Sequence, residues 1–138
     1  MTRVAAVLLV ALIVSCGSTG TAGPSPTASP IPSPVISAKG AITLKTPTVN
    51  ATVSSPVTIS GDASVFEAAL AWRITDTAGR VIVEGNTTAS LGAPGRGTYS
   101  LSATYVVPSQ TVAFIEVFSR SAKDGNIDEI VRIPVTLR

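Results

Sequence analysis

The stretch FEAALAWRIT, residues 66–75, gives the clearest indication of the fold. Apolar and aromatic side chains alternate along it with small or charged ones. The apolar set is Phe66, Ala68, Leu70, Trp72 and Ile74, and Glu67 and Arg73 belong to the other set. Successive side chains of a β-strand point to opposite sides of the sheet, so this alternation predicts a strand with one buried face. We expect Phe66 and Trp72 to point into the core.

Six more short strands are expected on either side of this one. They cover residues 41–45, 56–60, 80–84, 99–107, 111–119 and 130–137. Turn signals separate them, including Asp76–Gly79 and Lys123–Asn126, because Asp binds its own backbone and Gly adopts a positive φ readily. A long loop is expected over residues 85–97. About seven short strands without helical periodicity predict an all-β sandwich, with an up-and-down barrel as the alternative.

The segment before these strands has a different composition. Five of the ten prolines fall between Pro24 and Pro34, among Ser, Thr and Ala residues. Such a sequence has no apolar face to bury and favours extended conformations of about 3.1 Å per residue. We therefore expect residues 17–39 to be a tether that reaches up to roughly 70 Å.

The only cysteine, Cys16, follows an apolar run from Val4 to Val14 and the small residue Ser15. The segment Ile13-Val14-Ser15-Cys16 resembles the lipobox of bacterial lipoproteins. An apolar run of this length is too short to cross a bilayer of about 30 Å as a helix, and it suits the core of a signal peptide. The expected division is a signal peptide (1–15), a lipid-anchored tether (16–39) and a folded domain (40–138). This places the chain outside the cytoplasm, attached to the cell membrane through Cys16.

Several elements in the folded part resemble a known bacterial family. They are Pro47, Ser55-Pro56-Val57, Ile59, Gly61, Ala63, Val65-Phe66-Glu67-Ala68, Asp76, Gly79, Glu116-Val117-Phe118, Ser121, Lys123-Asp124-Gly125 and Ile133-Pro134-Val135. In order and spacing they resemble the immunoglobulin-like spore-germination domain found with GerM modules in bacterial surface proteins. The resemblance implies an immunoglobulin-like antiparallel sandwich of about seven strands on an exported lipoprotein. It implies no catalytic residues.

Charge and composition exclude several classes of function. Residues 40–138 contain eight basic and eight acidic residues, and the net charge of +2 for the whole chain comes from Arg3 and Lys39. A neutral domain without a basic stripe lacks the means to neutralise phosphates, so we do not expect nucleic acid as a partner. Histidine is absent, which removes the most frequent general base and imidazole metal ligand. We expect no cofactor.

Two acidic features allow other interpretations. Asp124, Asn126, Asp128 and Glu129 lie close together and carry oxygen ligands of the kind that calcium prefers. Their spacing departs from the EF-hand pattern, so a hairpin turn is the favoured interpretation and no metal site is predicted. The eight acids also permit a carboxylate pair for glycoside hydrolysis, although Trp72, Tyr99 and Tyr105 fall on faces that suggest core.

One sheet face is the candidate binding surface. In an immunoglobulin-like fold the strands at residues 66–75, 111–119 and 130–137 are neighbours in one sheet. The alternation then places six side chains on its outer face: Glu67, Arg73, Phe114, Glu116, Phe118 and Arg132. The alternative is a structural set of cross-strand ion pairs flanked by partly covered rings.

The expected function is therefore that of a non-catalytic, lipid-anchored module of the bacterial envelope. Its partner would be an envelope protein or a wall polymer, and its membrane contact would be made through Cys16. The alternative is an extracytoplasmic hydrolase that acts on wall glycan through carboxylates.

Overall fold

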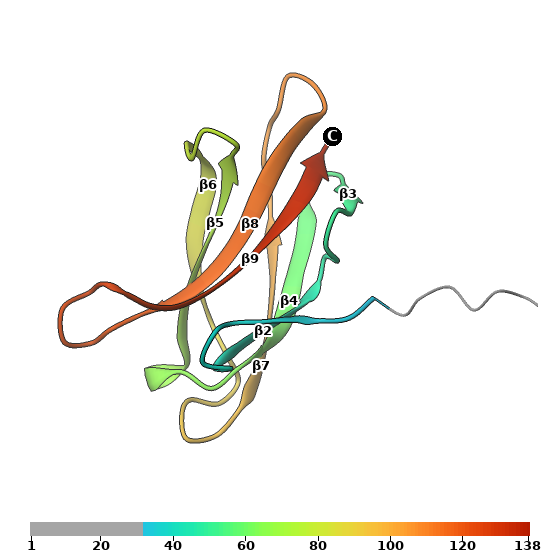
Figure 1. Ribbon diagram of the computed structural model, residues 1–138. Coiled ribbons are helices and arrows are strands. Elements are labelled where there is room, and N and C mark those ends of the chain that lie inside the picture. Colours follow the sequence, from blue (N-terminus) through green and yellow to red (C-terminus); the bar gives the residue numbers. More distant parts are fainter. Residues whose placement is uncertain (1–31) are drawn as a thin grey trace, which may run out of the picture. The chain divides into compact units, whose positions relative to one another are not determined.

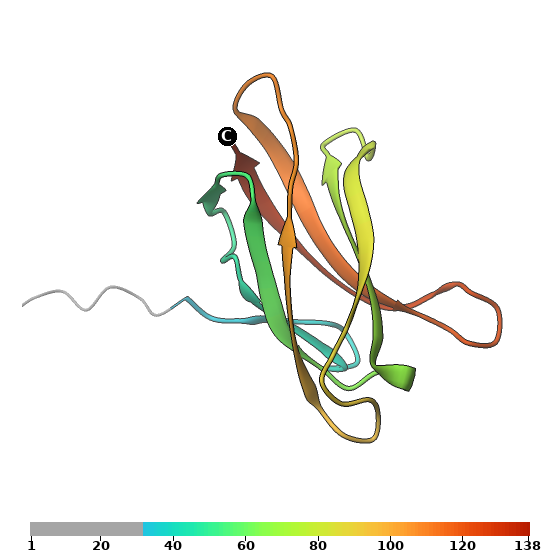
Figure 2. The same cartoon turned by 180° about the vertical axis from the view of Figure 1, so that it is seen from behind.

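The computed structural model describes residues 32–138, and these form a sandwich of two β-sheets without an α-helix (Figure 1). The strand order is β1-β2-β4-β7 in one sheet and β3-β9-β8-β5-β6 in the other. Paired strands are antiparallel except for β3 and β9, which are parallel. Strands β8 and β9 lie in front in Figure 1, and β4 and β7 lie in front in the view from behind (Figure 2). The all-β sandwich is confirmed.

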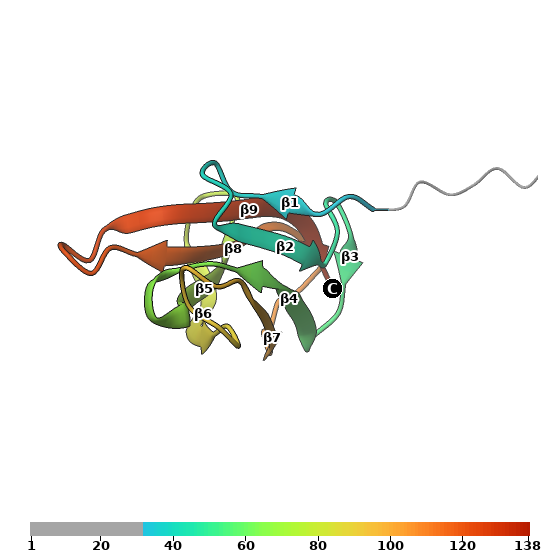
Figure 3. The ribbon, with the colours of Figure 1, turned by 90° about the horizontal axis from the view of Figure 1, so that it is seen from below.

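The smaller sheet consists of β1 (Val35–Ile36), β2 (Ile42–Thr46), β4 (Val57–Ala63) and β7 (Gly97–Ala103). The larger sheet consists of β3 (Thr52–Val53), β5 (Ala69–Asp76), β6 (Val81–Thr88), β8 (Thr111–Arg120) and β9 (Ile127–Leu137). The β8–β9 hairpin projects beyond the rest of the sandwich (Figure 3). Strands β9, β8 and β5 are direct neighbours, as the sequence predicts.

The core lies between the inner faces of the two sheets. Aliphatic side chains from both sheets are fully buried there, among them Ile42, Ile59, Ile74, Ile115 and Ile133. Residues 31–138 form one compact unit with this single core. A fragment that starts at Ile31 therefore contains every contact described below and has what it needs to fold alone.

Trp72 belongs to this core and is 8% exposed, which confirms its predicted orientation. Its indole covers Gly85 on the neighbouring strand β6, where an added Cβ would lie 2.8 Å from the ring. Tyr99 and Tyr105 are also buried. Their hydroxyl groups donate hydrogen bonds to the carbonyl oxygens of Thr43 (3.0 Å) and Val53 (2.7 Å). Burial raises the pKa of both phenols.

The strand predicted over residues 66–75 begins only at Ala69. Its first three residues form a 3₁₀ turn, Phe66–Ala68, in which Glu67 and Ala68 have φ values of 54° and 57°. The chain passes here from one sheet to the other, so it turns where the alternation predicts extension. Phe66 is consequently 64% exposed, and its expected place in the core is wrong.

Two further predictions need correction. The loop expected over residues 85–97 is shorter, because β6 continues to Thr88 through its pairing with β5. The described residues contain nine strands instead of about seven. The two additional strands, β1 and β3, have two residues each and are too short to show a period.

The sandwich also begins earlier than residue 40. Strand β1 lies within the segment expected to be tether, and Val35 pairs with Leu44 while Ile36 pairs with Thr43. Residues 1–31, which include the expected signal peptide, Cys16 and most of the tether, lie outside the described residues. Within residues 32–138, no helix is long and apolar enough to cross a membrane.

Candidate functional site

The outer face of the larger sheet carries a row of charged residues that runs across three strands. Arg73 of β5 lies opposite Glu116 of β8, and Glu116 lies opposite Arg132 of β9. Phe114 and Phe118 lie two residues to either side of Glu116 and therefore share its face. We name this cluster the arginine face; it comprises Arg73, Phe114, Glu116, Phe118, Arg120 and Arg132.

Glu116 is the centre of the arginine face and is only 5% exposed. Arg73 donates a hydrogen bond from Nε to Oε2 of Glu116, and Arg132 Nε lies 3.2 Å from Oε1. Each carboxylate oxygen thus has its own guanidinium partner. The two sequence neighbours of Glu116 on β8, Ile115 and Val117, are fully buried in the core. This confirms the prediction that Phe114, Glu116 and Phe118 lie on the opposite, outer face of the strand.

The two phenylalanine rings are covered by arginine side chains. The guanidinium carbons of Arg73 and Arg120 each lie 5.1 Å from the centre of the Phe118 ring. The guanidinium carbon of Arg132 lies 3.8 Å from the centre of the Phe114 ring. These distances are within the range of cation–π attraction. Phe118 is only 2% exposed as a result, although it faces away from the core.

The sequence predicts exposed rings on this face, and the structure shows one fully covered and one half-buried. The ion pairs flanked by covered rings match the structural alternative raised above. Glu67 is not part of the face, because it lies on the 3₁₀ turn before β5. The structure adds Arg120 to the residues that the sequence predicts for this face. Arg120 lies at the end of β8, and the sequence alone does not indicate that its side chain covers Phe118.

Two adjoining hollows lie beside the arginine face, over the small side chains Ala69 and Ala71 of β5. Their volumes are about 250 and about 390 Å³. Both are lined by Ala71, Asn86 and Arg120, and the larger one also reaches Phe118. The gap exists because alanines on β5 leave space that larger residues on β6 and β8 do not fill.

The residues considered for calcium are occupied by protein contacts. Glu129 is 4% exposed and accepts hydrogen bonds from the Ser37 hydroxyl and from the backbone N–H groups of Lys39 (2.8 Å) and Ala41 (3.1 Å). Asp128 forms an ion pair with the Lys39 ammonium at 2.7 Å. Asp124 binds Asn126 within the hairpin turn. Across residues 32–138, no group of three acidic, Cys or His side chains is arranged to hold a metal.

Two carboxyl groups outside the arginine face, those of Asp62 and Asp76, have lowered pKa values. Burial alone would raise the pKa of Asp62, but Lys45 and Arg96 outweigh it and lower the pKa. The backbone N–H of Arg80 and its guanidinium lower the pKa of Asp76. A glycosidase acid requires the opposite, a raised pKa, and these groups do not have it.

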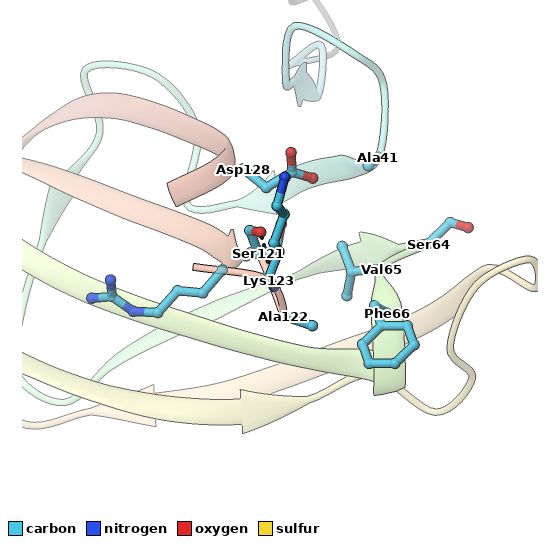
Figure 4. Close-up of a pocket in the computed structure, with 10 residues that line it drawn as sticks. Ala41, Ser64, Val65, Phe66, Ser121, Ala122, Lys123 and Asp128 are labelled. Atoms are coloured by element: carbon cyan, nitrogen blue, oxygen red, sulfur yellow. Dashed lines mark hydrogen bonds between the residues drawn. The ribbon is translucent and has the colours of Figure 1, made fainter. Parts of the chain in front are cut away.

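A third hollow, of about 390 Å³, lies at one end of the sandwich (Figure 4). Val65 and Phe66 lie on one side of it, and Lys123 and Asp128 of the β8–β9 hairpin lie on the other. We name it the Phe66 hollow. Sequence reasoning missed it because the alternation places Phe66 in the core, and only the turn at Glu67 brings the ring to the surface.

Comparisons with known proteins identify the family of this chain. One solved structure that is similar is CopC from Methylosinus trichosporium OB3b, with 20% identity and a TM-score of 0.44 over 68% of this chain and 90% of that chain. A search of curated proteins found no match to this chain. Residues 41–126 match the model of a family described as the immunoglobulin-like domain of bacterial spore germination. That match covers more than half of the chain, which therefore belongs to this immunoglobulin-like family of bacterial spore-germination domains.

Proposed function

We propose that the chain is a lipid-anchored interaction module that acts outside the cytoplasm of a bacterium. The lipobox-like segment ending at Cys16, the apolar run before it and the Pro-rich segment after it support the anchor and the tether. Membership in a domain family of bacterial spore germination fits a role at the cell envelope. The module itself makes the contact with an envelope protein or wall polymer.

The arrangement of the arginine face carries this proposal. Arg73, Arg120 and Arg132 rest on phenylalanine rings, and two of them are also bound to the buried Glu116. Arginine side chains that are already fixed lose less conformational entropy when a partner binds. The Arg132 side chain remains 49% exposed, so its outer N–H groups face solvent and fit acceptor groups of a partner.

The geometry supports binding better than hydrolysis. Glu116, the most buried carboxylate of the larger sheet's outer face, is neutralised by two arginines. Asp62, Asp76 and Glu129 have lowered pKa values and protein partners. A carboxylate-based hydrolase needs one acid that stays protonated near neutral pH, and an ion-paired carboxylate does not serve that purpose.

The anchor is tested by replacing the acceptor cysteine. Cys16→Ala should move the protein from the membrane fraction to the soluble or secreted fraction, because two acyl chains give stable attachment and the variant has none. Fractionation followed by immunoblotting measures the distribution, and Ser15→Ala is the matched control because it keeps a small residue before Cys16. A Cys16→Ala protein that stays with the membrane would contradict the anchor.

The arginine face is tested by removing two charges and keeping Arg73, which holds the buried Glu116. The double variant Arg120→Gln with Arg132→Gln should stay folded, with a lower melting temperature because Phe118, Phe114 and Glu116 each lose one arginine contact. It should lose at least tenfold in partner capture from envelope extract after crosslinking, measured at a temperature where both proteins are folded. Arg80→Gln is the matched control, because the Arg80 side chain is 84% exposed and contacts none of the residues of this face in the interactions given above. Equal capture by the double variant and wild type would refute the binding role of the face.

A further inference from the structure

Strand β6, with eight residues, is the longest strand at the end of either sheet. It pairs with β5 on one side only (Figure 1). Among the described residues, no backbone group of another segment bonds to its other side. A bulge at Ile82 interrupts the pairing with β5, and the strand is regular from Val83 to Thr88. We name the free side of residues 83–88 the β6 edge. Its outward N–H and C=O groups are available to an added strand.

The other strands that end a sheet offer less. Strands β1 and β3 have two residues each. Strand β7 is partly covered at its start, because Thr98 donates its N–H to the Ser90 hydroxyl (3.0 Å) and its carbonyl oxygen accepts the Ser90 N–H (2.9 Å). Strand β6 contains neither proline nor lysine, the residues that commonly block an edge. It is therefore the end strand most open to pairing.

Two side chains on the outer face of the β6 edge set the chemistry of a partner. Glu84 is exposed, and its carboxylate has no ion-pair partner among the described residues. Arg73 lies opposite Glu84 on β5 but is bound to Glu116. Asn86, two residues further along the strand, is exposed on the same face. An amide donor from a partner strand therefore suits Glu84, and a carboxylate suits Asn86.

The β6 edge meets both needs when it pairs with itself. In an antiparallel pair of identical strands, two residues that lie opposite each other must belong to the same face of the sheet. With Gly85 opposite its own copy, Glu84 of each strand lies opposite Asn86 of the other. On the inner face, the half-buried Val83 then lies opposite Thr87 and gains cover.

The two neighbouring registers are less favourable. With Glu84 opposite its own copy, two carboxylates face each other, which destabilises a strand pair. With Asn86 opposite its own copy, Glu84 faces Thr88 instead of an amide. Val83 then faces Ala89, which lies beyond the end of β6. The charges and the strand length therefore favour the register centred on Gly85.

We propose that the β6 edge binds the β6 edge of a second copy of this chain, as an antiparallel pair centred on Gly85. The pair is two-fold symmetric and joins the larger sheets of both copies into one continuous sheet. A strand pair of this length buries less than the roughly 1,600 Å² of a standard stable interface, so we expect a weak dimer in solution, with a Kd of about 0.1–1 mM. Attachment of both copies to one membrane, as proposed above, raises their effective concentration.

The first test measures self-association of the purified fragment 31–138 by sedimentation equilibrium and NMR, at concentrations from about 0.05 to about 2 mM. We expect concentration-dependent shifts centred on β6. Asn86→Glu should weaken the dimer by about fivefold or more, because it places carboxylates opposite each other at two equivalent places. Asn86→Lys should tighten the dimer by a similar factor, because each ammonium meets Glu84 of the other copy. Ser102→Glu is the matched control: it adds the same charge to an exposed position of β7 and should leave the Kd unchanged.

The second test determines the register by disulfide crosslinking. The fragment 31–138 contains no cysteine, so single cysteines report only on the positions where they are introduced. Glu84→Cys mixed with Asn86→Cys should give mainly the mixed disulfide under mild oxidation, because these positions lie opposite each other in the proposed register and like positions do not.

Thermal melts establish that all variants fold. The proposal is overturned if the fragment stays monomeric at about 2 mM, if the concentration-dependent shifts lie away from β6, or if both Asn86 variants associate as wild type does. Disulfides between like variants that form as readily as the mixed one would overturn the register. These results do not depend on Cys16 or the arginine face, so failure here is distinct from failure of the proposed function.

Discussion

At the scale of single residues, Glu129 connects the beginning of the described chain to the larger sheet. Its carboxylate accepts hydrogen bonds from Ser37 and from the backbone of Lys39 and Ala41. Burial alone would raise the pKa of Glu129, but these hydrogen bonds and the charge of Lys39 together lower it. The folded chain therefore favours the ionised carboxylate.

This produces a defined dependence of stability on pH. A carboxyl whose pKa falls on folding stabilises the folded chain above its unfolded value of about 4.3 and loses that contribution as pH falls through the folded pKa. Glu129→Gln should lower the free energy of unfolding by about 1–3 kcal/mol at pH 7, because one of the two acceptor oxygens is replaced by an NH2 group that faces a hydrogen-bond donor. The difference between wild type and variant should shrink towards pH 3.

Urea denaturation at both pH values measures this difference. Glu67→Gln is the control, because Glu67 is exposed on the 3₁₀ turn and its replacement should change stability by less than about 0.5 kcal/mol. A difference for Glu129→Gln that is the same at pH 3 and pH 7 would show that ionisation of this carboxylate does not contribute.

At the scale of elements, β8 is buried on both faces over residues 115–119. Its inner face joins the core through Ile115 and Val117, and its outer face is covered by arginines from β5, β9 and its own end. The two outer rings differ, because Phe118 is 2% exposed and lies between two guanidinium groups while Phe114 is half-buried beneath one.

Replacing these rings one at a time should reveal that difference. Phe118→Ala should lower the free energy of unfolding by about 3 kcal/mol, in the range of a core phenylalanine, and Phe114→Ala by only about 1 kcal/mol. Chemical denaturation of the two single variants provides the measurement. Equal losses would mean that the arginines do not exclude water from Phe118 in solution. Replacing Phe114 and Phe118 together would not show how much each ring contributes to stability, so the single variants are more informative.

At the scale of the whole molecule, the segment before β2 is an integral part of the sandwich. Strand β1 extends the smaller sheet, Ser37 is buried, and Lys39 binds the β8–β9 hairpin. A fragment of residues 40–138 should therefore be at least about 2 kcal/mol less stable than the fragment 31–138, since it loses several hydrogen bonds and leaves Glu129 partly unpaired.

A double-mutant cycle tests this assignment. Glu129→Gln should destabilise the fragment 31–138 and have a much smaller effect in the fragment 40–138, where most of the hydrogen-bond donors to Glu129 are missing. The same loss in both fragments would contradict a connection through Glu129.

The sequence by itself determined the all-β sandwich, the neighbouring positions of β5, β8 and β9, and the inward direction of Trp72, Ile115 and Val117. The alternation of apolar and polar residues is a local signal, and it indicates which residues of a long strand lie on the same face of the sheet. The family could be recognised for the same reason, because its turns and strand ends occur at fixed spacings.

Only the tertiary structure decided which side chains cover each face of the strands. Phe118 is buried because the register of β5 and β8 places Arg73 beside it, and Phe66 is exposed because the chain turns between sheets at Glu67. Strand β1 has two residues and no period, so its place appears only through pairing with β2. Register, crossover turns and very short strands depend on contacts between distant residues, and a local pattern does not contain them.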